Sequence, residues 1–97
     1  MKTKRIAFLG GGNMAEAIIG GLLAGGVAME RNVVAADVAA ERRAALERKY
    51  GIGTTADNAA AVRGADVVVL AVKPQQAAEA LAAARDAFTE NQLLASI

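Results

Sequence analysis

Several residue types that often carry chemistry are missing from this chain of 97 residues. It has no cysteine, no histidine and no tryptophan, and its aromatic side chains are one tyrosine and two phenylalanines. Without cysteine or histidine the chain cannot form a disulfide, a zinc site of ordinary composition, or the Ser-His and Cys-His pairs of nucleophilic catalysis. So few aromatic rings cannot build a platform on which nucleic-acid bases stack. We therefore expect no metal site and no catalysis of these kinds.

Long hydrophobic runs and an excess of one charge are also absent. No apolar run reaches the roughly 18 residues that a membrane-spanning helix needs. The 11 basic and 10 acidic residues leave a net charge of +1, which gives no electrostatic reason to expect nucleic acid or an anionic membrane as a partner. Residues 1–5 are basic, but the apolar stretch 6–9 that follows is too short for a signal peptide. We expect a charged lead-in to a first strand, and a cytoplasmic protein.

The most informative feature that is present is a glycine-rich motif near the amino terminus. Gly10, Gly12 and Ala15 occupy the three special positions of G-x-G-x-x-G/A, between the apolar run 6–9 and a helical pattern that begins at Asn13. The first glycine allows a tight turn, the second lets the backbone approach a pyrophosphate, and the small third residue lets the helix pack closely. Backbone N–H groups at the helix start, aided by the helix dipole, attract a phosphate. The motif predicts a nucleotide cofactor.

Apolar strands and helical patterns alternate along the rest of the chain. The expected strands are residues 6–9, 32–36, 52–55, 66–72 and 92–97, and the expected helices are residues 13–24, 40–50, 58–62 (capped by Asp57 or Asn58) and about 75–88. Such alternation predicts an α/β fold, a Rossmann-type doubly wound parallel sheet with strand order 3-2-1-4-5. Because the sequence stops within a strand, we expect residues 1–97 to be one cofactor-binding domain, incomplete at its carboxy terminus.

An acid follows the second expected strand. At the position of Asp37 an acid commonly accepts hydrogen bonds from the adenosine ribose, although Asp37 could instead be the N-cap of the next helix. A carboxylate there favours NAD over NADP because it repels a 2′-phosphate. Arg42 and Arg43 could offset that repulsion, or they could be ordinary solvated charges on the helix surface with i,i+4 partners. The residues therefore leave NADP and NAD both open as the cofactor.

The strongest expected strand, residues 66–72, ends at Lys73-Pro74. In the predicted strand order it lies beside the first strand, at the topological switch point where doubly wound sheets bind their ligands. The backbone of residues 71–74 can reach the ribose–nicotinamide half of a cofactor there. Lys73 could attract a phosphate or an anionic substrate, or it could be an exposed loop lysine. Asn58 could bind the adenosine end of the cofactor or only cap its helix.

Two segments resemble the pyrroline-5-carboxylate reductases. They are residues 6–22, Ile-Ala-Phe-Leu-Gly-Gly-Gly-Asn-Met-Ala-Glu-Ala-Ile-Ile-Gly-Gly-Leu, and residues 65–75, Ala-Asp-Val-Val-Val-Leu-Ala-Val-Lys-Pro-Gln. The glycine-rich loop with Asn-Met is shared with other nucleotide-dependent reductases, but its pairing with Ala-Val-Lys-Pro at this distance is more specific. The resemblance extends over essentially the whole chain. In the family, a strand similar to Ser96-Ile97 runs on into an Ala-Ala-Gly loop.

This resemblance implies that the full-length parent reduces 1-pyrroline-5-carboxylate to L-proline with NAD(P)H, and that this chain supplies the cofactor-binding part. In that family the position of Asp37 often carries serine or threonine in members that favour NADPH. The family's cofactor contacts would fall on Leu9, Gly10, Gly11, Gly12, Asn13, Met14, Asp37, Asn58, Ala71, Val72, Lys73 and Pro74.

The family's helical carboxy-terminal domain builds most of the pocket for the small-molecule substrate and joins the subunits of a homo-oligomer. We therefore nominate no catalytic residue in this chain and expect it to be inactive alone. Two alternatives stay open: another small-substrate dehydrogenase, of the hydroxyacid or deazaflavin-dependent type, and a stand-alone sensor that binds a nucleotide. A truncated chain would also expose an apolar edge and self-associate.

Overall fold

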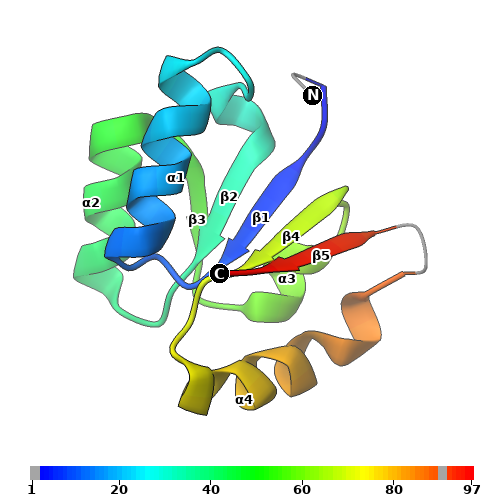
Figure 1. The fold of residues 1–97 in the computed structure, drawn as a ribbon. Helices are drawn as coiled ribbons and strands as arrows, with labels where there is room; N and C mark the ends of the chain where they lie inside the picture. Colours follow the sequence, from blue (N-terminus) through cyan, green and yellow to red (C-terminus); the bar gives the residue numbers. More distant parts are fainter. Residues whose placement is uncertain (1–2, 90–91) are drawn as a thin grey trace.

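The computed structural model of the chain describes residues 3–89 and 92–97 and arranges them as a parallel sheet between two layers of helices (Figure 1). Met1 and Lys2 of the predicted lead-in lie outside the described residues. The strands are β1 (Ile6–Leu9), β2 (Val33–Ala36), β3 (Gly53–Thr55), β4 (Val67–Leu70) and β5 (Leu93–Ser96), and the helices are α1 (Asn13–Ala24), α2 (Ala40–Tyr50), α3 (Asn58–Val62) and α4 (Pro74–Ala84). The described strands lie in the order β3-β2-β1-β4-β5, which confirms the predicted fold class and strand order.

The register of the sheet places the strand ends that matter for a ligand at one edge. Leu9 at the end of β1 lies opposite Ala36 on β2 and Leu70 on β4. All the pairings are parallel, so the loops that leave β1, β2, β3 and β4 emerge together. The carboxyl edge of the sheet is therefore where residues far apart in the sequence meet.

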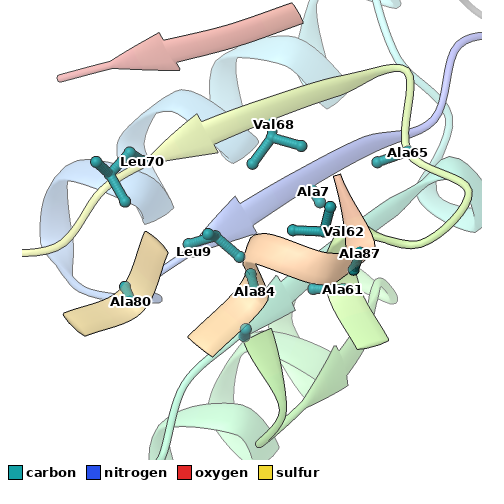
Figure 2. Packing of buried hydrophobic residues seen from close by; sticks show 11 residues of the cluster. Ala7, Leu9, Ala61, Val62, Ala65, Val68, Leu70, Ala80, Ala84 and Ala87 are labelled. Carbon is teal, nitrogen blue, oxygen red and sulfur yellow. The ribbon is translucent and has the colours of Figure 1, made fainter. Parts of the chain in front are cut away.

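Alternation along the strands divides the core into two clusters, one on each face of the sheet. Ile6 and Phe8 point to the face covered by α1 and α2, whereas Ala7 and Leu9 point to the face covered by α3 and α4. Figure 2 shows the second cluster, where alanines of α4 face Leu9 and Leu70. Small side chains on the helices let them lie close to the sheet, so a chain with few aromatic residues still buries both faces.

Several element ends differ from the prediction. By one residue, β3 begins at Gly53 and β4 at Val67, α4 begins at Pro74, and β5 covers only Leu93–Ser96. Asn32 belongs to a 3₁₀ helix, Glu30–Asn32, and not to β2. The predicted helix to residue 88 ends at Ala84 and continues as a 3₁₀ helix, Arg85–Ala87. The fourth strand stops at Leu70, two residues before the predicted end, because its neighbours β1 and β5 end opposite it at Leu9 and Ser96. The N–H of Ala71 still donates to the carbonyl of Leu9, whereas Gly10 donates to Ala36 on β2.

The cap of α3 is Asp57. Its Oδ1 accepts a hydrogen bond from the backbone N–H of Ala59 at 3.0 Å, and Asn58 is the first residue of the helix. The capping role considered for Asn58 was therefore wrong, because the preceding aspartate already satisfies the free N–H group of the first turn.

β5 is an edge strand that pairs with β4. Leu93, Leu94 and Ile97 are 64%, 46% and 48% exposed, so the apolar edge that the sequence suggested is present, and self-association through it stays a prediction. No helix in the part of the chain that the structure describes is long and apolar enough to cross a membrane.

Candidate functional site

A cleft of about 530 Å³ opens at the carboxyl edge of the sheet. Four of the predicted cofactor contacts line it: Gly10 after β1, Asp37 after β2, Asn58 at the start of α3, and Val72 after β4. A second, smaller cleft of about 230 Å³ lies at the opposite, amino-terminal edge and includes none of the predicted contacts. The larger cleft is therefore the candidate site.

The first glycine of the motif is held in a conformation that other residues avoid. Gly10 has φ +105°, and a Cβ atom there would lie 2.7 Å from the carbonyl oxygen of Ala71. Its N–H donates to the carbonyl of Ala36 at 2.8 Å. The loop after β1 thus turns between the ends of β2 and β4, as the predicted tight turn requires.

The next glycines of the loop have opposite surroundings. Gly12 is the N-cap of α1, and a Cβ atom added to it would meet nothing within 4 Å. A Cβ atom on buried Gly11 would lie 2.9 Å from Leu46 Cδ1. The space beside Gly12 is open, whereas Gly11 is packed against the core.

The start of α1 is suited to an anion. The backbone N–H groups of Gly12, Asn13 and Met14 meet no protein acceptor within residues 3–89 and 92–97. They sit at the positive end of a helix of 12 residues. The open space above Gly12 leaves them accessible, so this geometry fits the pyrophosphate of a dinucleotide.

Asp37 ties the glycine-rich loop to the turn that follows β2. Its Oδ2 accepts from the N–H of Gly11 at 3.0 Å, and its Oδ1 accepts from the N–H of Ala39 at 2.9 Å. The N-cap of α2 is Ala39, so the interpretation of Asp37 as that cap was wrong. Each carboxylate oxygen accepts one N–H group, and a carboxylate oxygen can accept more than one, so Asp37 keeps acceptor capacity at the cleft that it lines.

Arg42 and Arg43 make contacts that the sequence analysis missed. The Nε of Arg42 donates to the carbonyl of Gly11 and its Nη2 to the carboxylate of Glu16, while the Nη1 of Arg43 donates to the carbonyl of Asp37 at 2.8 Å. Both side chains are half-buried, so their interpretation as solvated charges with i,i+4 partners was wrong. The two contacts of Arg42 join residues that are 31 and 26 positions apart in the sequence, so no local sequence pattern could predict them.

Glu16, in the first turn of α1, joins α1 to α2. Besides Arg42, it accepts from the Nζ of Lys49 and from the hydroxyl of Tyr50, each at 2.8 Å. The hydrogen bonds from Lys49, Tyr50 and Arg42 lower the pKa of Glu16 from 4.5 to about 2, and Glu16 in turn raises the pKa of Lys49. The sequence analysis did not single out Glu16, because its partners lie on another helix.

Three further predicted cofactor contacts, Leu9, Lys73 and Pro74, are not among the residues that line the cleft. Leu9 is fully buried, and its carbonyl accepts from the N–H of Ala71 at 2.8 Å, so it joins the ends of β1 and β4 and its side chain does not face a ligand. Lys73 is exposed at the N-cap of α4, where its side chain has no partner among the described residues, and Pro74 opens that helix. Whether these residues touch a ligand stays a prediction. Among the described residues no cluster of acidic side chains could hold a metal ion.

We predict opposite effects of threonine at two glycines of the loop. Gly12→Thr should change the free energy of unfolding by no more than about 0.5 kcal/mol, because the space is open and threonine caps helices as well as glycine does. Gly10→Thr should cost about 3 kcal/mol or more, because of its positive φ and the clash with Ala71. Urea denaturation of both variants measures the difference, and equal losses would contradict this account of the loop.

We also predict that Glu16 gives the fold a pH dependence. Its pKa is 4.5 in the unfolded chain and about 2 in the fold, so its contribution to stability is complete above pH 4.5 and is lost as the pH falls toward 2. Glu16→Gln should be less stable than the wild type at pH 7 and should lose less stability between pH 4.5 and pH 2. Thermal unfolding across this range tests it, and an unchanged slope would show that Glu16 does not carry the effect.

Comparison with known proteins adds to this geometry. A family model described as NADP oxidoreductase, coenzyme F420-dependent, matches residues 5–97. Pyrroline-5-carboxylate reductases from Vibrio alginolyticus and Pseudomonas aeruginosa are 44% and 46% identical over 97 residues, covering 100% of this chain and 35% of each relative. The resemblance seen in the sequence is thus confirmed, and the chain spans about a third of the length of the curated relatives it matches.

Solved structures agree with the fold. A pyrroline-5-carboxylate reductase from Coxiella burnetii superimposes with a TM-score of 0.92 at 36% identity, over 98% of this chain and 35% of that one. The Plasmodium falciparum pyrroline carboxylate reductase with NADP bound gives a TM-score of 0.83 at 23% identity, over 100% of this chain and 34% of that one, and at this identity it supports the fold alone.

Proposed function

The chain belongs to the family of NADP oxidoreductases described as coenzyme F420-dependent, and from that premise we propose that it is the cofactor-binding part of a pyrroline-5-carboxylate reductase. The observation that carries the proposal is the start of α1, where open space beside Gly12 adjoins free backbone N–H groups. The similarity of the whole chain to pyrroline-5-carboxylate reductases supplies the substrate. The parent would be a cytoplasmic homo-oligomer that converts 1-pyrroline-5-carboxylate to L-proline.

Residues of the cleft and of the nearby start of α1 would divide the cofactor between them. The N–H groups of residues 12–14 would bind the pyrophosphate, and the free lone pairs of Asp37 would accept from the adenosine ribose. Asn58 would contact the adenosine end, and the backbone of residues 71–74 the nicotinamide half. When bound, the nicotinamide supplies the hydride that reduces the carbon–nitrogen double bond of the substrate.

The contribution of this chain is then to bind and orient the cofactor. Gly11 and Ala15 pack against the core, so the loop is shaped before the cofactor arrives. The carboxylates that line the cleft lie where the cofactor would bind, and we assign none of them to proton transfer with the substrate. We propose accordingly that the chain alone binds cofactor and reduces nothing.

The family description favours one competing candidate, an oxidoreductase that works with a deazaflavin coenzyme. The two candidates share the glycine-rich loop and differ in substrate. The full-length parent reduces 1-pyrroline-5-carboxylate under the first proposal and does not under the second.

Calorimetric titration of the chain with NADH and NADPH tests the proposed function. We expect saturable binding of at least one nucleotide, weakened at least tenfold by Gly12→Thr because its side chain fills the pyrophosphate space. Gly21→Thr is the matched control: it lies on the same helix, also meets nothing within 4 Å, and should bind as the wild type does. A folded wild-type chain that binds neither nucleotide would contradict the proposal, as would proline formation by the chain alone.

A further inference from the structure

The candidate cofactor cleft is lined by acids. Asp37, Asp57 and Glu79 line it, and no lysine or arginine among the described residues does. The cationic lining lies at the other edge of the sheet, where Arg5, Arg31 and Arg63 border the smaller cleft. The charged side chains that line the candidate cofactor cleft are therefore all acidic, and Asp37 and Asp57 lie at the side assigned to the adenosine.

The two arginines nearest to this side are already engaged. Arg42 donates to the carbonyl of Gly11 and forms an ion pair with Glu16, which directs its charge toward α1. Arg43 donates to the carbonyl of Asp37, and neither arginine is among the residues that line the cleft. Moving either of them to a phosphate would break contacts that hold the loop or the turn after β2.

The carboxylate of Asp37 can accept further hydrogen bonds but cannot donate any. A ribose 2′-hydroxyl can donate to its free lone pairs, whereas a 2′-phosphate brings about 1.5 to 2 negative charges and no matching donor at neutral pH. The N–H groups of Gly11 and Ala39 hold the carboxylate in place, so it cannot swing away to relieve the repulsion.

We propose that this site discriminates against the 2′-phosphate of NADPH and takes NADH as its preferred cofactor, with Asp37 as the residue that determines the specificity. The inference rests on the proposed function and deepens it. A preference for NADH differs from the family description, which names NADP as the cofactor. The three acids that line the cleft add to the effect, and Asp37 dominates because it accepts from the loop itself.

Dissociation constants for NADH and NADPH, measured by fluorescence titration of the wild-type chain, test the proposal without any substitution. We expect NADH to bind at least tenfold more tightly at low ionic strength. The ratio should shrink as salt is added, because screening weakens the repulsion of the 2′-phosphate and leaves the hydroxyl contact nearly unchanged. Equal affinities, or tighter binding of NADPH, would overturn the inference while leaving the proposed function intact. Failure to bind either nucleotide would overturn both.

Three variants test whether Asp37 causes the preference for NADH over NADPH. Asp37→Asn keeps the size of the side chain and one acceptor, and it should bring the two affinities within about threefold of each other. Glu79→Gln removes a charge from the same cleft at a side chain with no hydrogen bond to the loop, and it should keep most of the preference. Arg43→Gln removes the hydrogen bond to the carbonyl of Asp37, so it should weaken the binding of both nucleotides together and leave their ratio unchanged. A selective loss of NADPH binding in Arg43→Gln would instead identify Arg43 as a phosphate ligand and contradict the proposal.

Discussion

Both backbone polar groups of one residue in the glycine-rich loop, Gly11, are held, and the candidate site depends on that restraint. The N–H of Gly11 donates to Asp37 and the carbonyl of Gly11 accepts from Arg42, which is itself fixed by Glu16. Three consecutive glycines have large conformational freedom, and ordering them costs more entropy than ordering other residues. Contacts from β2's turn and from α2 offset this cost, so the loop keeps the N–H groups at the start of α1 facing open space.

The sheet and the buried core also help to hold the glycine-rich loop in position. Alternating side chains of β1 contribute to both core clusters, so the strand that carries the loop is the most enclosed element of the sheet. Leu46 of α2 is buried and would meet a Cβ atom on Gly11, which shows how closely the loop lies on the core. Because the strands are parallel, the turns after β2 and β4 reach the same edge and complete the cleft. Alanines make up much of the buried core around a few larger side chains such as Phe8, Leu9 and Leu46, and these small residues let the helices approach the sheet closely.

Local patterns predicted the elements and the glycine-rich loop, because each depends on neighbours in the sequence. The run Val67–Leu70 is apolar and its three valines are β-branched, and Gly51 with φ +70° ends α2 at the predicted place. Predictions failed where distant parts compete. Asp57 and Asn58 are both residue types that cap helices, and the residue types alone could not show that Asp57 is the one that accepts from the N–H of Ala59. The contacts of Arg42 and Glu16 join separate helices, so no periodicity could reveal them.

The most direct test of the account is to follow the backbone amide signals of the chain by nuclear magnetic resonance during a titration with NADH. If the glycine-rich loop is the cofactor site, the largest shifts belong to residues 10–14, with Asp37, Asn58 and Val72 next, and the signals of Arg31 and Arg63 stay in place. Shifts centred on the cleft lined by Arg5, Arg31 and Arg63 would contradict the account, because they would place the nucleotide at the opposite edge of the sheet.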